Sequence, residues 1–240
     1  MTLHDPPLDK LALIIWWHIR SQADVGRGKQ LITDFTSKMN GFHDPIDLGP
    51  TVPEFNPPLM PFIKKELRHL EKDVRLTISN ESIKLEHFKK DYNWSEFHAI
   101  VNTVVKKAHE SLEDIFKEEL DHVHLEIKYE NFFLNESKLD VLEFVADNFN
   151  LRIDTIKQDS NNPIGFGLVL AYEKEELGDL RLDFGVKNKR SQQGVVFDIE
   201  LESNKVPFEV DEMMQWIEKS KTCCHKSFFS FAKKYEDDKS

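Results

Sequence analysis

The chain has 240 residues and carries 32 Lys and Arg against 43 Asp and Glu, a formal net charge of −11. Hydrophobic residues make up 40% and include 18 Phe and 4 Trp, which excludes a disordered chain, because such chains are poor in aromatic residues. The acidic balance disfavours binding to nucleic acid or to anionic membrane surfaces, since the average field repels phosphates. We therefore expect a folded protein without a nucleic-acid partner.

The first apolar run predicts a central strand. Between Leu11 and Ile19, apolar residues occupy both alternating faces, as in a strand that is buried on both sides. The run is shorter than the ~20 apolar residues that span a membrane, and it lacks the features of a secretory signal. The only cysteines are the adjacent Cys223 and Cys224, which fits a reducing compartment. We expect a cytoplasmic protein without a membrane segment.

The next segments predict a helix followed by a long loop. Residues 29–39 carry apolar side chains at helical spacing, and the preceding Gly26-Arg27-Gly28-Lys29 is interpreted as a flexible turn between strand and helix. Six prolines follow between residues 41 and 61. Because proline lacks a backbone donor and has a fixed φ, we expect this stretch to be an extended surface loop.

The middle of the chain predicts a hairpin, a capped helix and a strand. Apolar positions on either side of a polar tetrad give residues 74–88 the pattern of a hairpin. Asn93, with Glu96 three residues later, marks the start of a helix that carries a long apolar stripe. Alternating apolar and polar residues at 122–129 then indicate a strand with one buried and one polar face.

A second round of elements follows. Ser137 can cap a helix that extends to Phe149, and a final helix is expected from about Val210 to Ala232. Strands with alternating apolar residues are expected at 151–156, 164–173, 180–187 and 194–202. Antiparallel runs of strands with helices at their ends favour the α+β class, with mainly antiparallel sheets and long helices packed on them.

The chain is expected to contain two similarly organised halves, because in each half a strand pair leads into a long helix. We place an N-terminal α+β half at residues 1–135, with the Pro-rich loop at 41–61, and a C-terminal α+β half at residues 136–240. No residue-by-residue repeat accompanies this order, which leaves open whether the halves are a true duplication.

The sharpest candidate site consists of His122, His124 and Glu126. Residues two apart on a strand project from one face, and imidazole and carboxylate groups are ligands of divalent metals. The alternative is a solvated sheet face on which polar residues alternate with core positions. We favour the solvated face, since a strand rarely positions three ligands without a second element. The expected cofactor is therefore none, with a divalent metal as the alternative.

Other polar clusters predict no specific chemistry. No phosphate-binding loop, nucleophile elbow or zinc-protease motif occurs in the chain. Two short basic groups are interpreted as solvated surface rather than phosphate contacts. They are Lys64, Lys65 and Arg68, and Lys187, Lys189 and Arg190. The adjacent cysteines before His225 lack the spacing of zinc ligands and are interpreted as ordinary helix residues.

Several segments carry a resemblance to a known family. They are Pro6-Pro7-Leu8, Arg75–Ser79 with Ile83–Leu85, Tyr92–Phe97, and Val123–Asn131. On these segments the chain resembles an uncharacterised, sporadically distributed family of prokaryotic proteins of similar length. The family shows an Arg-Tyr-Ile-Asn pattern where this chain has Lys128-Tyr129-Glu130-Asn131. The resemblance implies no assigned activity. Its patchy distribution implies horizontal transfer, which is common among accessory parts of antiviral defence systems.

Two functions are compatible with these patterns. We expect a non-catalytic protein-binding or scaffold subunit, an accessory or regulatory component of a prokaryotic antiviral defence system, whose partner is a protein encoded nearby. Its docking surface is expected to include the Pro-rich loop or an exposed sheet edge, because free edges accept a further strand. The alternative is a metal-assisted hydrolase that uses the strand face of His122, His124 and Glu126.

Overall fold

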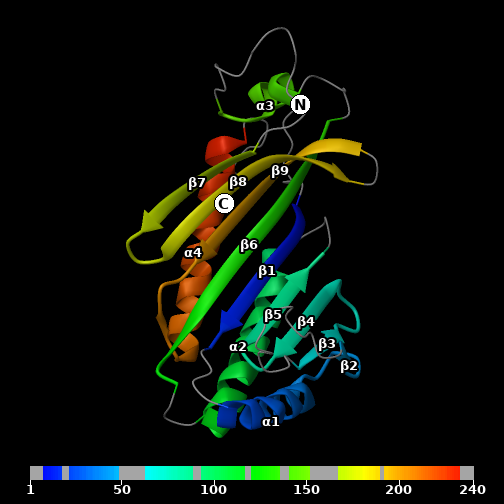
Figure 1. Cartoon of the computed structure of the whole chain (residues 1–240), viewed down its shortest axis with the longest axis vertical. Helices are drawn as coiled ribbons and strands as arrows, with labels where there is room; N and C mark the ends of the chain where they lie inside the picture. The colour runs from blue at the N-terminus through cyan, green and yellow to red at the C-terminus, as the bar shows by residue number, and fades with distance from the viewer. Residues whose placement is uncertain are drawn as a thin grey trace.

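The computed structural model describes residues 8–17, 22–48, 63–88, 93–116, 120–135, 141–151, 167–189 and 192–232. Within these residues the chain forms one antiparallel sheet of ten strands with four helices packed on it (Figure 1). The strand order is β2-β3-β4-β5-β1-β6-β9-β8-β7, and β10 pairs with β6. The predicted α+β class and antiparallel pairing are confirmed.

The bounds of the elements follow the chain order. The strands are β1 (Leu8–Trp16), β2 (Ile46–Asp47), β3 (Lys64–Arg68), β4 (Val74–Ser79), β5 (Ser82–His87), β6 (His122–Leu134), β7 (Gly167–Lys174), β8 (Gly178–Lys189), β9 (Gln192–Glu202) and β10 (Val206–Pro207). The helices are α1 (Gln22–Lys38), α2 (Trp94–Phe116), α3 (Val141–Asn148) and α4 (Val210–Phe231).

The helices α2 and α4 lie on one face of the sheet, behind the strands in Figure 1, and α1 lies below the lower ends of the strands. Helix α4 packs against β6 and β9, and α1 packs against α2. We call this the covered face and the opposite one the open face. No helix among the described residues is long and apolar enough to cross a membrane.

Strand β1 is central, as predicted, because it pairs with both β5 and β6. Its side chains Leu11, Leu13 and Ile15 are buried on the covered face. The expectation that both faces are buried is wrong at the end of the strand, where Trp16 on the open face is 41% exposed. A run of apolar residues cannot reveal on which face of the sheet the described helices pack.

Helix α1 begins at Gln22, so the glycine pair predicted to form a turn lies inside the helix. A Cβ atom at Gly28 would lie 2.7 Å from the Cβ of Asn80 in the β4–β5 turn, whereas Gly26 has nothing within 4 Å. The predicted turn was wrong because glycine at position 28 is needed for another reason. It allows the helix to approach the β4–β5 hairpin closely, and this packing outweighs the poor helix propensity of glycine. The predicted apolar side chains Leu31 and Phe35 are buried.

The Pro-rich segment contains a short strand where we expected only a loop. β2 follows Pro45 directly, and its residue Ile46 pairs with Glu66 of β3. Proline does not interrupt this strand, because it precedes the paired residues. Residues 49–62 lie outside the described part of the chain, so most of the predicted loop at 41–61 stays a prediction.

The capped helix is confirmed as α2. The Asn93 side-chain oxygen accepts hydrogen bonds from the backbone N–H of Ser95 at 2.9 Å and of Glu96 at 3.4 Å. The stripe positions Val101 and Val104 are completely buried. The hairpin that precedes this helix is also confirmed, with β4 and β5 paired in antiparallel register.

The second round of elements agrees with the sequence where it is described. β7, β8, β9 and α4 occur at the expected places, but the predicted cap Ser137 and the strand expected at 152–156 lie outside the described residues.

An aromatic core joins the sheet to α4. The rings of Phe184 and Phe197 stack with their centroids 4.1 Å apart, and Phe228 of α4 stacks on Phe197 at 6.0 Å.

Candidate functional site

Charges on the open face are paired where β5, β1 and β6 meet. The ammonium group of Lys10 on β1 contacts carboxylates of both neighbouring strands, Glu86 of β5 at 3.6 Å and Glu130 of β6. Lys84 contacts Glu86 from the same strand at 2.8 Å. These half-buried ion pairs tie three strands together and leave little uncompensated charge there.

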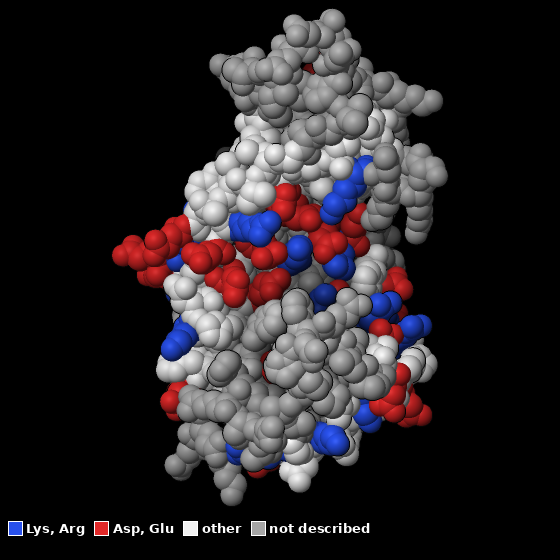
Figure 2. All heavy atoms as spheres, in the orientation of Figure 1, with Lys and Arg blue, Asp and Glu red and all other residues white. Residues whose placement is uncertain are grey.

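Carboxylates predominate farther along the open face, on β6, β9 and β8. Figure 2 shows them as a red area across the middle of this face. Lys128 lies among them and contacts Glu200 at 3.2 Å. The pKa of Glu126 is raised above its ordinary value by burial and then by repulsion from Glu200 and Glu202. Negative charge on this part of the face is therefore only partly neutralised.

Asp198 is the most perturbed carboxyl group of this cluster. Burial and then the charge of Glu130 raise its pKa from 3.8 to about 6. Its Oδ1 atom is buried without a hydrogen-bond partner among the described residues. A carboxyl group with this pKa can exchange a proton near neutral pH, but acid–base catalysis also requires a substrate positioned beside it.

The predicted metal ligands share one face of β6, as expected, but spread along the strand. His122 is exposed at its start, where it pairs with Pro207 of β10. The Nδ1 atom of His124 lies 3.4 Å from the carbonyl oxygen of Ser203. Within the described residues, no three His, Cys, Asp or Glu side chains lie close enough together to hold a metal ion. The metal site of His122, His124 and Glu126 thus gains no geometric support and stays a prediction.

The first predicted basic group is divided between the two faces of β3. Lys64 and Arg68 alternate with Lys65, which points to the other face and contacts Asp47 at 3.8 Å. Arg68 donates to the carboxylate of Glu66 at 2.9 Å. Lys65 and Arg68 therefore have acidic neighbours. In the second basic group only the side chain of Lys187 lies among those described.

The adjacent cysteines lie in α4, as interpreted from the sequence. Cys224 is buried, and burial raises the pKa of its thiol well above the ordinary value. The ring of His225 contacts Phe229, with the centroids 4.6 Å apart. This environment favours packing over metal binding or nucleophilic chemistry.

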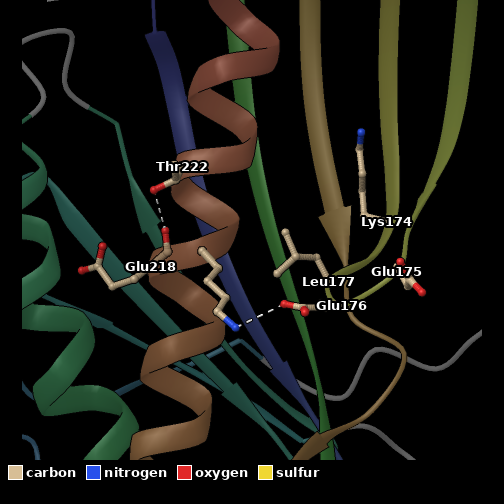
Figure 3. A pocket seen from close by; sticks show the side chains of 7 residues that line it. Lys174, Glu175, Glu176, Leu177, Glu218 and Thr222 are labelled. Carbon is tan, nitrogen blue, oxygen red and sulfur yellow. Dashed lines mark hydrogen bonds and ion pairs between the residues drawn. The ribbon is translucent and has the colours of Figure 1, made fainter. Parts of the chain in front are cut away.

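An open groove lies between the β7–β8 turn and α4 (Figure 3). Lys219 of α4 contacts the carboxylate of Glu176 across it at 3.4 Å. In the neighbouring hollow, Trp216 donates from its indole nitrogen to the carbonyl oxygen of Leu177 at 3.0 Å. These contacts attach the turn to the helix. The residues that line the groove include no convergent set of catalytic groups.

Strand β7 is the feature of this region with the clearest binding potential. It runs for eight residues without proline, and among the described residues it pairs only with β8. Val169 is 51% exposed and Tyr172 is 41% exposed. A long edge strand with exposed apolar side chains presents a row of free backbone groups to another chain.

The direction of these backbone groups follows from the turn. The carbonyl oxygen of Lys174 accepts a hydrogen bond from the N–H of Leu177 at 2.8 Å, so Lys174 faces the hairpin. Successive residues of an antiparallel strand direct their backbone groups alternately to the two sides. Val169, Ala171 and Glu173 therefore direct theirs away from β8, toward the free edge.

The opposite edge of the sheet differs. β2 has only two residues and follows Pro45, a short edge of the kind that resists pairing. Sequence patterns predicted β7 as a strand but not as an edge. Its apolar residues on both faces are typical of a buried strand, and only the pairing order places it at the border.

No family model matches the chain, and no curated protein is significantly similar to it in sequence. The resemblance to a sporadic prokaryotic family therefore stays an expectation. Any functional conclusion depends on the surface described above.

Proposed function

We propose that this chain is a non-catalytic protein-binding subunit that accepts a strand of its partner at the free edge of β7. The observation that carries the proposal is the length and apolar character of this edge, with Val169 and Tyr172 exposed on its two faces. Strand addition provides affinity through backbone hydrogen bonds and specificity through alternate side chains.

The covered side of β7 also favours an added strand. Leu168 and Leu170 are half-buried and pack against the hydrophobic core. Because they lie at the border of the sheet, apolar side chains of a docked strand would extend the core past them. Binding would thus combine backbone pairing with burial of apolar surface.

We also propose that residues 1–135 and 136–240 form two similarly organised halves. The order of pairing supports this division. In residues 1–135 the paired strands β4 and β5 precede the long helix α2, and in residues 136–240 the paired strands β8 and β9 precede the long helix α4.

The biological setting is proposed from the family resemblance. A sporadic prokaryotic distribution favours an accessory or regulatory component of an antiviral defence system, with a protein partner encoded nearby. The alternative of a metal-assisted hydrolase would require stoichiometric zinc or manganese in the purified protein, and its loss in His124→Ala would support that function.

The test of strand addition uses the outward N–H of Ala171. Ala171→Pro removes this donor without removing a donor to β8, and Ala171→Thr is the matched control that retains it. Partners captured from the native host would be identified, produced separately and titrated against each variant. We expect binding to the wild type and to Ala171→Thr, and its loss in Ala171→Pro. A partner that binds Ala171→Pro normally, or no partner at all, would overturn the proposed function.

A further inference from the structure

We infer that the partner segment docked on β7 is an extended strand in which basic residues alternate with apolar ones. This inference rests on the proposed function and names the chemistry of its partner. The basic side chains would lie over the open face and the apolar ones over the covered face. The inference follows from the carboxylates on the open face beside β7 and from the apolar side chains on its covered face.

The open face next to β7 is rich in carboxylates. In the sheet register Val169 lies opposite Asp183, and Glu173 lies opposite Asp179. One strand farther, Asp183 lies opposite Asp198 on β9. The carboxylates of β7, β8 and β9 on this face are Glu173, Asp179, Asp183, Asp198, Glu200 and Glu202, and the described cations are Arg181 and Lys187. Negative charge therefore dominates the surface that a docked strand would border (Figure 2).

This charge is within reach of a strand added at β7. A new strand would lie two strand spacings, about 10 Å, from β8. Lys and Arg side chains can extend over small neighbours and place their charges beyond them. Val169 is the small exposed side chain between the new strand and Asp183, whereas Ala171 lies opposite Arg181, which contacts Asp183 at 3.2 Å. Basic residues facing this side would meet carboxylates, whereas acidic ones would be repelled.

The covered face requires different side chains. There β7 presents Leu168, Leu170 and Tyr172, which lie opposite Phe184, Leu182 and Leu180 of β8. Apolar residues of the partner would pack beside this row. Because successive residues of a strand point to opposite faces, the two requirements combine into an alternating basic and apolar pattern.

A second copy of the chain fits this edge less well. Two copies paired through β7 would place their open faces side by side, with Glu173 and Asp183 of each copy near the junction. Each chain carries a net charge of −11, so the two faces would repel one another. A basic segment of another protein removes this repulsion.

The experiment uses three fluorescent peptides as long as β7 and the full chain. One peptide alternates Val and Lys, one alternates Val and Glu, and the third is the Val–Lys peptide with methylated amide nitrogens, which keeps its charge but cannot pair as a strand. Each is titrated to millimolar concentration. The protein variants are Ala171→Pro, its control Ala171→Thr, the double variant Glu173→Gln with Asp183→Asn, and the charge-matched control Glu113→Gln with Asp147→Asn.

We expect the Val–Lys peptide to bind the wild type at least about tenfold more tightly than the Val–Glu peptide. Methylation of the peptide and Ala171→Pro should each abolish binding. The double variant at Glu173 and Asp183 should weaken binding by about threefold or more, and the two control variants should bind as the wild type does. Circular dichroism of each variant checks that the fold is retained.

The possible results distinguish the inferred charge pattern from strand addition itself. Equal binding of the Val–Lys and Val–Glu peptides, lost in Ala171→Pro, would overturn the inferred charge pattern and leave strand addition intact. Binding of the methylated peptide, or no binding of any peptide, would overturn the inference, while capture of the host partner tests the proposed function separately. A wild-type dimer that dissociates in Ala171→Pro would identify a second copy as the occupant and also overturn it.

Discussion

The two faces of the sheet differ in composition along the same strands. On β9 the covered face carries buried apolar side chains, and the open face carries charged ones. The buried residues are Val195, Phe197, Ile199 and Leu201, and the charged ones are Asp198, Glu200 and Glu202. One strand therefore contributes stability through one face and a charged surface through the other, because successive side chains point in opposite directions.

The covered face therefore stabilises the fold, whereas the open face is available to a partner. Burial of apolar surface on the covered face is the main source of stability. Ion pairs at partly exposed positions, such as Lys128 with Glu200, contribute little. Changes on the open face should therefore alter binding and pH dependence while the fold persists. Four measurements test this contrast.

The largest effect is expected for Phe197→Ala on β9. Phe197 is completely buried and stacks on Phe184, so its removal should lower the free energy of unfolding by about 3–5 kcal/mol. Val196→Ala, one residue away on the open face, should cost only about 1 kcal/mol. Urea denaturation measures both. Equal losses would show that the open face contributes to the core as much as the covered face does.

A second test compares two glycines of α1. Gly28→Ala should destabilise the protein by about 1–3 kcal/mol, because its Cβ would lie 2.7 Å from the Cβ of Asn80. Gly26→Ala should stabilise it by up to about 1 kcal/mol, since nothing lies within 4 Å and alanine favours a helix. Thermal denaturation gives the sign of each change. A stabilising Gly28→Ala would contradict the close packing of α1 on the β4–β5 turn.

A smaller effect is expected at the start of α2. Asn93→Ala removes the side-chain oxygen that accepts hydrogen bonds from Ser95 and Glu96 and should cost about 1 kcal/mol. Asn93→Ser retains a capping oxygen and should restore most of the stability. If Asn93→Ala unfolds at the same urea concentration as the wild type, the capping hydrogen bonds do not stabilise helix α2 on the covered face.

The last test concerns pH and the open face. The pKa of Asp198 is raised from 3.8 to about 6 in the folded protein, so the folded state binds this proton more tightly than the unfolded state does. The resulting stabilisation is fully present at pH values below the pKa of Asp198 in the unfolded state. It is lost as the pH rises through the pKa of Asp198 in the folded state. Asp198→Asn should therefore flatten the fall in stability across this window, with a residual slope from Glu126, whose pKa is also raised. An unchanged slope would contradict the role of Asp198.

Local patterns were sufficient for most elements. The cap at Asn93, the hairpin around the β4–β5 turn and the alternating strand that begins at His122 depend on residues close in sequence. Periodicity and capping act over one or two turns of chain, so they can be seen in a single segment. The position of Gly28 inside α1 could not be predicted in this way, because its reason is the contact with Asn80, far along the chain.

The candidate binding surface depended on long-range pairing. The sequence alone determined the α+β class, the long helices and the polar face of β6, since each follows from side-chain spacing. Only the tertiary structure decided that β7 lies at the border of the sheet with Val169 exposed, and that Asp183 and Asp198 lie beside each other on neighbouring strands. The physical reason is that strand order and register arise from hydrogen bonds between distant segments, whereas spacing along one segment specifies only which of its faces is apolar.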